Sequence, residues 1–432
     1  FLTTDASGNT SWSAIDLTAL SASNLTSGTL PDARFPATLP ASSAANLTSI
    51  PAANITGTLP AIDGSNLTGI SATPADGSIT QAKLNFPVAN RNLIDNGEFV
   101  VSQRDFSSAV TQTGEAFTID RWKTRMSANS KFSVQQVADA PAGFYNSAKI
   151  TSLAATSVGA SDYYQFQHCI EGYNINPANF GTATAKALVF SFYVKSSLTG
   201  TFSVCFSNNA GDRFLVQNYT ISSADTWERK TITIPALTTG SWNRDNTGGL
   251  FIYFTLGAGS GTLQSTGSWG TSFGRGGTGG ANIVATNAAT WQVTGVQLEV
   301  GSVATEFEHL SFEDQLRRCQ RYYFKRTGGN GDQLCLGYAE SSNRFAFMIN
   351  YPVPMRENPS FTGSATSARF YANNPSETFN LSDLVVFQQP TTPNPEQGAL
   401  WKESTGGATA GQAGGLQTYD SNTGTMEFSA EL

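Results

Sequence analysis

The chain has 432 residues, of which 39% are hydrophobic and 13% are charged, and its formal net charge is −7. Charged residues make up about 25% of an ordinary globular protein, so this surface is unusually poor in charge. No Lys/Arg-rich patch is present, which excludes nucleic-acid binding driven by phosphate contacts, and no apolar run is long enough to predict membrane insertion. The length suggests about three domains, and the composition changes near positions 85 and 310.

Residues 1–85 are predicted to form an extended, repeat-containing stalk. An Asn-(Leu/Ile)-Thr triplet begins at Asn24, Asn46, Asn54 and Asn66, and single large apolar residues recur regularly between small polar residues, Gly and Pro. One such chain cannot bury these side chains and should be disordered alone. Three copies in register would bring the repeated residues together on a common axis, so a homotrimer is predicted. The residues predicted to lie on that axis are Leu25, Leu30, Leu47, Ile55, Leu59 and Leu67.

A flexible Ser/Thr/Gly spacer is an alternative to the stalk, but the apolar spacing is too regular for a spacer. The triplets are also formal N-glycosylation acceptors, although a structural repeat already accounts for their recurrence. The chain opens at Phe1 without an initiator Met, and we expect an anchoring segment upstream of it.

Residues 86–310 are predicted to form a jelly-roll β-sandwich. Apolar residues occupy every second position over 188–195, and the pattern returns over 202–206 after a short turn, which predicts a hairpin. Over 291–300 the apolar phase changes at Gly295, which predicts a β-bulge. Many short strands with Gly- and Asn-rich connections favour two packed sheets, so the fold class is all-β.

Motifs in this region resemble a known family. Residues 92–99 (Asn-Leu-Ile-Asp-Asn-Gly-Glu-Phe) and 119–122 (Ile-Asp-Arg-Trp) resemble the opening of the carbohydrate-binding-module-like jelly roll of bacteriophage tail fibres. Residues 291–309 are similar to its last strand and exit, and residues 319–323 and 352–356 resemble the segment that follows it. The resemblance implies a trimeric receptor-binding protein in the virion tail fibre, joined upstream to other virion tail proteins. Its implied partner is a host cell-surface polysaccharide or lipopolysaccharide.

Residues 311–326 are predicted to form a short helix or joint, and residues 327–432 a C-terminal β-rich tip domain. Ser311 opens a capping-box pattern, and acid–base pairs four residues apart favour a helix. The pairs are Glu313 with Arg317 and Asp314 with Arg318, and the predicted apolar face is Phe312, Leu316, Cys319 and Tyr323. The four widely spaced cysteines are expected to be free thiols, and a Cys319–Cys335 disulfide is the alternative.

No catalytic residue, metal site or cofactor is predicted. Residues 270–274 match a nucleophile elbow and 274–279 a dinucleotide fingerprint, but both lie in the Gly-rich run 257–281. Each motif needs a strand entering and a helix leaving, so we interpret the run as a long surface loop. His168 and His309 are more simply explained by structural roles.

The few acidic residues do not predict a hydrolytic site. A glycan hydrolase needs two carboxylates facing each other across a sugar. Glu306 and Glu308 could share one face of a strand, but a solvated distribution explains the few acids better. Asp95 or Glu98 could contribute to a structural calcium site, although no cluster of ligands supports one.

Aromatic residues with polar neighbours are the candidate glycan contacts, because flat apolar rings pack against sugar rings. Tyr193 and Tyr253 lie on the predicted outward side of their strands and could form a sugar platform. Trp242 with Arg244, and Trp269 with Arg275, lie in predicted loops. The alternative is that these rings cover the edge of the sandwich or a trimer contact.

The sequence therefore predicts a non-enzymatic tail-fibre protein that attaches to the host by reversible glycan binding. The alternatives are a tail-spike glycan depolymerase, a purely architectural virion segment and a bacterial surface adhesin. Clustered acids in one groove would favour the depolymerase, whereas aromatic rings buried against other proteins would favour the architectural segment.

Overall fold

The fold was taken from a computed structural model, which describes residues 2–12, 90–364, 367–371, 377–380, 383–386, 396–403, 408–418 and 423–432. The chain divides into two compact units, Phe1–Thr73 and Pro74–Leu432. The described part of the first is an antiparallel pair of strands, β1 (Leu2–Thr4) and β2 (Thr10–Trp12). The six predicted stalk-axis residues lie outside the described residues, so the trimeric stalk stays a prediction.

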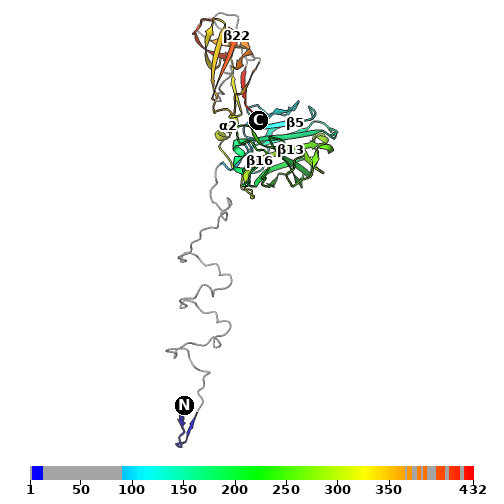
Figure 1. Cartoon of the computed structure of the whole chain (residues 1–432), viewed down its shortest axis with the longest axis vertical. Coiled ribbons are helices and arrows are strands. Elements are labelled where there is room, and N and C mark those ends of the chain that lie inside the picture. Colours follow the sequence, from blue (N-terminus) through cyan, green and yellow to red (C-terminus); the bar gives the residue numbers. More distant parts are fainter. Residues whose placement is uncertain are drawn as a thin grey trace. The chain divides into compact units, whose positions relative to one another are not determined.

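The second unit contains a sandwich of two six-stranded antiparallel sheets (Figure 1). The first sheet, in spatial order, consists of β11 (Phe214–Ile221), β10 (Gly200–Asn208), β13 (Gly248–Ala258), β8 (Tyr163–Glu171), β5 (Trp122–Met126) and β4 (Ala116–Phe117). The second consists of β12 (Glu228–Ile234), β9 (Leu188–Ser196), β16 (Thr290–Val300), β7 (Ser147–Ser152), β6 (Phe132–Val137) and β3 (Val110–Thr111). The predominantly β fold is confirmed, whereas the jelly-roll class stays a prediction.

Alternating apolar residues build the core between the two sheets. The rings of Phe192 on β9 and Phe254 on β13 lie 5.0 Å apart, and both side chains are fully buried. Trp122 and Trp291 are also fully buried in this core. Burial of large apolar side chains from both sheets is the main force that holds them together.

The hairpin predicted between residues 188–195 and 202–206 is wrong. β9 pairs with β12 and β16, while β10 pairs with β11 and β13, so the chain crosses from one sheet to the other between them. The rings of Phe190 and Phe206 consequently meet across the core, 5.4 Å apart. An alternating pattern shows which side of a strand is buried, but it does not show which sheet the strand joins.

The predicted bulge at Gly295 is confirmed. The pairing of β16 with β9 shifts register between Thr294 and Gln297, and Gly295 has a φ of 59°. A β-carbon at Gly295 would lie 2.7 Å from the Cζ atom of Phe144, so both the backbone conformation and the neighbouring ring require glycine.

The predicted helix is present as α2 (Phe312–Gln320), in which the Ser311 hydroxyl accepts a hydrogen bond from the Asp314 N–H at 3.1 Å. Its predicted apolar face is partly wrong, because Phe312 is 57% exposed whereas Gln315 is buried and accepts a hydrogen bond from the Asn96 N–H. Arg318 forms an ion pair with Asp95, not with Asp314 as the spacing predicted.

The other helical segments among the described residues are short: α1 (Gly172–Ile175) and the 3₁₀ turns Asn176–Ala178, Ser260–Thr262 and Ile283–Ala285. No helix in the described ranges is long and apolar enough to cross a membrane.

The predicted tip region contains two further sheets. A three-stranded sheet has the order β17 (Tyr323–Gly328), β26 (Gly424–Ser429) and β20 (Ser360–Gly363). A seven-stranded sheet has the order β22 (Glu377–Asn380), β21 (Ser367–Tyr371), β25 (Ala413–Thr418), β18 (Gln333–Ser341), β19 (Arg344–Asn350), β24 (Gln397–Glu403) and β23 (Val385–Val386). All four cysteines are buried and free, as expected.

A buried ionic network connects the end of the described chain to the sandwich. The Arg121 guanidinium donates to Glu431 Oε2 at 2.6 Å and to the Cys169 carbonyl at 2.7 Å, and it lies 3.4 Å from the centre of the Tyr322 ring. Arg104 adds a second contact to Glu431, at 3.2 Å. These contacts fix the residues around Tyr322, which also lines a surface pocket.

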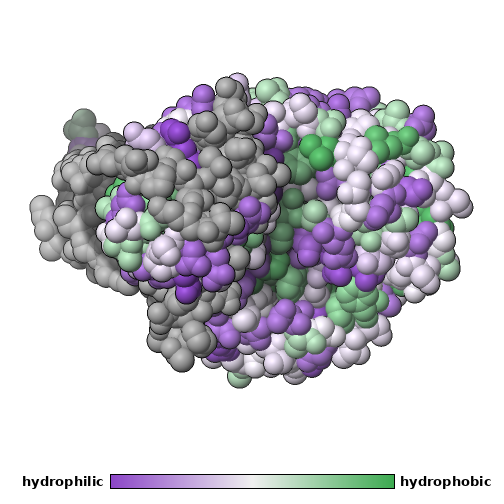
Figure 2. All heavy atoms as spheres, turned by 90° about the horizontal axis from the view of Figure 1, so that it is seen from above, coloured by the Kyte–Doolittle hydropathy of each residue, from purple (hydrophilic) through white to green (hydrophobic). Residues whose placement is uncertain are grey.

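The surface in Figure 2 is mixed in character. On the face drawn there, most described residues are polar or weakly apolar, and strongly hydrophobic ones gather in small groups. Such a distribution is typical of a surface in contact with water.

Candidate functional site

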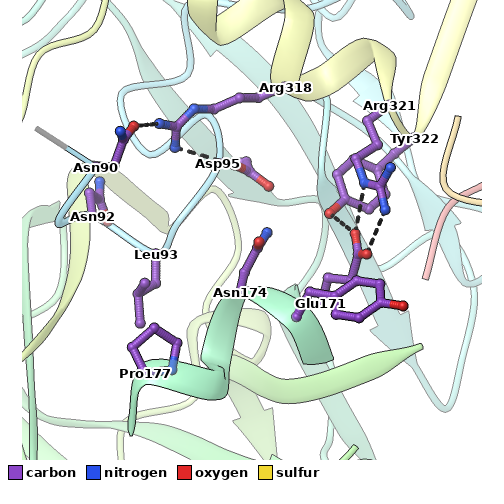
Figure 3. A pocket seen from close by; sticks show the side chains of 11 residues that line it. Asn90, Asn92, Leu93, Asp95, Glu171, Asn174, Pro177, Arg318, Arg321 and Tyr322 are labelled. Atoms are coloured by element: carbon purple, nitrogen blue, oxygen red, sulfur yellow. Dashed lines mark hydrogen bonds and ion pairs between the residues drawn. The ribbon is translucent and has the colours of Figure 1, made fainter. Parts of the chain in front are cut away.

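A pocket of about 490 Å³ is formed where three segments of the second unit meet (Figure 3). The segments are the stretch that leads into the sandwich, the end of β8 with α1, and the end of α2. The pocket is lined by Asn90, Asn92, Leu93, Asp95, Glu171, Tyr173, Asn174, Pro177, Arg318, Arg321 and Tyr322. Its volume is in the ordinary range for small-molecule sites.

The first wall of the pocket is fixed by Asn92. Its N–H donates to Glu308 Oε2 at 2.8 Å, and its side-chain oxygen accepts hydrogen bonds from the N–H groups of Ile94 and Leu298. Its side-chain nitrogen donates to the Val296 carbonyl at 3.2 Å. Because these groups are already engaged, Asn92 shapes the pocket and has little capacity left for a ligand.

The second wall centres on Glu171, whose side chain is 1% exposed. Arg321 donates to both carboxylate oxygens, at 2.7 and 3.0 Å, and the Tyr322 hydroxyl donates at 2.6 Å (Figure 3). A bidentate arginine–carboxylate pair is among the strongest and most directional polar contacts in proteins. This wall is therefore rigid and close to neutral in charge.

The third wall brings Asp95 and Arg318 together. Asp95 forms ion pairs with Arg318 at 3.8 Å and with the buried Arg121 at 3.6 Å, and Arg318 also donates to Asn90 Oδ1 at 2.7 Å (Figure 3). Asp95 and Glu171 thus balance Arg318 and Arg321 among the lining residues. A ligand without net charge suits such a pocket better than an ion does.

Two residues that line the pocket are exposed to solvent. Tyr173 is 59% exposed, and Asn174 is exposed as well. Neither side chain forms a hydrogen bond within the part of the chain that the structure describes. An exposed phenol ring beside an amide can pack against a sugar ring and hydrogen-bond its hydroxyls.

The sugar platform predicted from Tyr193 and Tyr253 does not form. Tyr193 lies on β9 and Tyr253 on β13, and the outward sides of these two sheets face opposite directions. Tyr193 is half-buried against Phe144, with ring centres 5.3 Å apart. Tyr253 is only 6% exposed, and its hydroxyl lies 3.2 Å from that of Ser207. The alternation of the strands correctly predicted the outward side, but it could not assign the strands to sheets.

The structure does bring Trp242 and Trp269 together. Their rings lie 5.8 Å apart, and both contact Phe180. Their indole N–H groups donate to the carbonyls of Thr239 and Pro235. Both rings are partly buried against the core, which favours the alternative that they cover the edge of the sandwich. Arg244 is exposed and donates to the Phe180 carbonyl, whereas Arg275 packs over Tyr163 of β8 in the first sheet.

Both histidines have the structural contacts expected of them. His168 is fully buried, with Nε2 3.1 Å from the Asp95 carbonyl, and burial holds its pKa well below the usual range. His309 Nδ1 lies 3.0 Å from Glu98 Oε2, and burial raises the pKa of Glu98.

Glu306 and Glu308 do not share a face, because the Glu306 side chain is 92% exposed whereas Glu308 is buried. Among the described residues, no group of three or more His, Cys, Asp or Glu side chains could hold a metal ion.

Sequence reasoning missed most of the pocket. Its lining residues come from positions 90–95, 171–177 and 318–322, and no single segment carries a recognisable motif for all of them. The structure adds a constraint at Gly172 that the sequence alone does not reveal, because a β-carbon there would lie 2.7 Å from the Asn243 carbonyl oxygen. Only glycine fits there, directly between Glu171 and Tyr173.

Comparisons with known proteins returned solved structures only. No protein-family model matches the chain, and no curated protein matches it either. A tailspike domain of bacteriophage CBA120, described as enzymatically active, is 11% identical over 50% of this chain, with a TM-score of 0.29. The match spans 22% of the tailspike chain, so the aligned part of this chain corresponds to less than a quarter of that chain's length.

Carbohydrate-binding modules are also among the similar structures. A family 11 module from Clostridium thermocellum, solved with a mixed-linked tetrasaccharide, is 13% identical over 46% of this chain and all of its own, with a TM-score of 0.26. A C-terminal family 22 module from the same organism is 12% identical over 50% of this chain and all of its own, also with a TM-score of 0.26.

Proposed function

We propose that this chain is a host-recognising fibre protein of a virion tail, trimeric through its stalk, which attaches to cells by binding envelope glycans. The single observation that carries glycan binding is the pocket, in which the exposed Tyr173 and Asn174 lie beside a rigid lining of paired charges. The opening and closing motifs of the sandwich support the tail-fibre part of the proposal.

The chemistry of the pocket favours a neutral, hydroxyl-rich ligand. Arg318 and Arg321 are partly exposed and can donate hydrogen bonds, the exposed Asn174 amide can donate and accept them, and Asp95 and Glu171 cancel the charges of the two arginines. Sugar hydroxyls both donate and accept, so one saccharide can use both kinds of partner. The Tyr173 ring supplies the apolar contact that a sugar ring needs.

The same contacts support reversible binding without hydrolysis. A glycoside hydrolase uses one carboxyl group as a proton donor and a second as a nucleophile or base. Glu171 already accepts three hydrogen bonds, and Asp95 faces two arginines. We therefore propose that neither carboxyl group turns over a substrate. Incubation with envelope polysaccharide should release no new reducing ends, and steady release would favour the depolymerase.

Binding of the full chain to an array of bacterial envelope glycans tests the proposal. Replacing Tyr173 by Ala should lower affinity for the bound glycan about tenfold, because one stacked aromatic contact is lost. The matched control is Tyr145→Ala, which removes a tyrosine that is 75% exposed and does not line the pocket. Trp269→Ala tests the loop site predicted from the sequence. Equal binding by the wild type and Tyr173→Ala would contradict the pocket, and no binding to any glycan would favour an architectural role.

A further inference from the structure

A second polar and aromatic cluster lies on the outer side of the first sheet, away from the residues of the pocket. Its centre is Arg275, in the Gly-rich run that the sequence predicted to be a surface loop. The prediction is only partly correct, because Gly274, Gly276 and Gly277 are buried. Residues 263–264 and 276–277 pair as the parallel strands β14 (Leu263–Gln264) and β15 (Gly276–Gly277).

The backbone of Arg275 is held firmly in place. Its N–H donates to the Thr262 carbonyl at 2.8 Å, and its own carbonyl accepts from the Thr255 hydroxyl at 2.7 Å and from the Gln165 side chain at 3.2 Å. A β-carbon at the preceding Gly274 would lie 2.3 Å from the side chain of Gln264, so the loop packs closely on its surroundings. None of these contacts depends on the guanidinium group.

The guanidinium itself is stacked between two rings. The Cζ atom of Arg275 lies 3.4 Å from the centre of the Tyr163 ring and 4.4 Å from that of Phe273. Among the described residues its side chain forms one hydrogen bond, to Gln165 Oε1 at 3.3 Å. Stacking of this kind holds the plane of the group and leaves its edge available to an acceptor.

The charges around Arg275 are not balanced. Glu115 pairs with Lys123 at 3.8 Å and with Arg125 at 3.2 Å, and none of the ion pairs recorded among the described residues includes Arg275. Glu115 also lies 3.3 Å from the hydroxyl of Tyr163, so Tyr163 connects Arg275 to this group. Two cations therefore share the Glu115 carboxylate and Arg275 adds a third positive charge beside them, so the local potential attracts anions. Partial burial also lowers the pKa of Arg275, which a bound anion would oppose.

Phe273 gives the cluster an apolar surface as well as a charge. Its side chain is 40% exposed, and its ring packs edge-on against Phe214 at 4.9 Å. A ring that is fixed in place and open to solvent beside a guanidinium suits a ligand with both an apolar ring face and an anionic group. Arginine matches carboxylate and phosphate geometry equally well, so the shared chemistry is an anionic oxygen group.

We propose that Arg275 and Phe273 form a second glycan-binding site, which binds the carboxylate of an acidic saccharide at Arg275 while the sugar ring packs on Phe273. The site shares no residue with the pocket, so a failure of sugar binding in the pocket would not disprove this second site. It also makes Arg275, a glycan contact already predicted from the sequence, selective for acidic units.

Titration calorimetry of the full chain with trigalacturonate tests this proposal, with neutral galactotriose and inorganic phosphate as comparison ligands. The wild type should bind trigalacturonate more tightly than either, and more weakly as salt rises. Arg275→Gln should lower the affinity about tenfold or more, because a charge-assisted hydrogen bond is lost. Arg275→Lys should bind more tightly than Arg275→Gln but more weakly than the wild type, because lysine keeps the charge but not the bidentate geometry.

Controls distinguish this site from the pocket and from general charge effects. Arg317→Gln removes an exposed arginine from α2 and should leave trigalacturonate binding unchanged. Phe273→Ala keeps Arg275 and should weaken the binding of trigalacturonate but not that of phosphate. Unchanged phosphate binding would show that the loop is still folded, so the loss would be specific to the saccharide. Equal affinity for phosphate and trigalacturonate would overturn the saccharide assignment. Loss of binding in Tyr173→Ala but not in Arg275→Gln would place the ligand in the pocket, and absence of binding by the wild type would also overturn the proposal.

Discussion

Arg121 is the residue on which the buried ionic network depends. Its side chain is 1% exposed, and it contacts Glu431, Asp95 and the Cys169 carbonyl. Arg121→Met keeps much of the volume but leaves two buried carboxylates with fewer partners, so we expect a loss of about 3–5 kcal/mol in the free energy of unfolding. Urea denaturation followed by tryptophan fluorescence measures this loss. The exposed Arg317→Met is the control, and a loss of less than about 1 kcal/mol for Arg121→Met would contradict the role given to the network.

Asp120 should make stability depend on pH. Burial raises its pKa to about 6 from 3.8, and the charge of Arg104 and hydrogen bonds from Gln103 offset this only in part. The folded state therefore holds the proton more tightly than the unfolded state does. The free energy of unfolding should fall by up to about 3 kcal/mol as pH rises through the window from 3.8 to 6. The Asp120→Asn variant has no titrating carboxyl group at this position, so its stability should lack this dependence on pH.

The measurement is the difference in unfolding free energy between the wild type and Asp120→Asn at several values from about pH 3.5 to about pH 7, which bracket the two pKa values. Other titrating groups contribute to both proteins and largely cancel in the difference. The variant should gain stability relative to the wild type as pH rises. A difference that does not change with pH would show that the Asp120 carboxyl group titrates at the same pH in both states.

Single residues also show how far the candidate site could be predicted. The outward orientation of Tyr193 and the surface position of Arg275 follow from strand phase and loop composition. The burial of Tyr253 does not, because Phe251 and neighbouring side chains on its own sheet cover it. Tyr173 and Glu171 become a site only when α2 packs beside them, and that contact has no local signature in the sequence.

The bend in β16 gives a prediction at the scale of one element. Gly295→Ala places a β-carbon 2.7 Å from the Phe144 ring and requires a left-handed backbone, since φ is 59°. We expect a loss of about 1–3 kcal/mol, visible as a lower melting temperature. The control is Gly270→Ala, where no atom lies within 4 Å of the added β-carbon. An equal effect of both substitutions would show that the bulge does not require glycine.

Strands and helices were predictable in proportion to how local their determinants are. β9 and β16 follow from apolar alternation, and α2 follows from the Ser311 cap, because these signals lie within each segment. The assignment of β10 to the opposite sheet depends on packing across the core, between Phe190 and Phe206. Likewise the buried face of α2 contains Gln315 and not Phe312 as predicted, because the Asn96 N–H needs a hydrogen-bond acceptor there.

For the whole molecule, the stalk should set the number of binding sites that act together. Replacing Leu47, Ile55 and Leu59 by Ser removes three of the predicted axis residues. The molar mass measured by light scattering should then fall from that of three chains of 45.8 kDa each to that of a single chain. Affinity of each chain for a free oligosaccharide should not change, whereas retention on a glycan-coated surface should fall by about 10² to 10⁴. Ser49→Ala with Ser65→Ala is the control, because it changes the predicted stalk segment but none of the predicted axis residues. If the wild type is already a monomer, or if the triple variant stays trimeric, the stalk does not assemble through these residues.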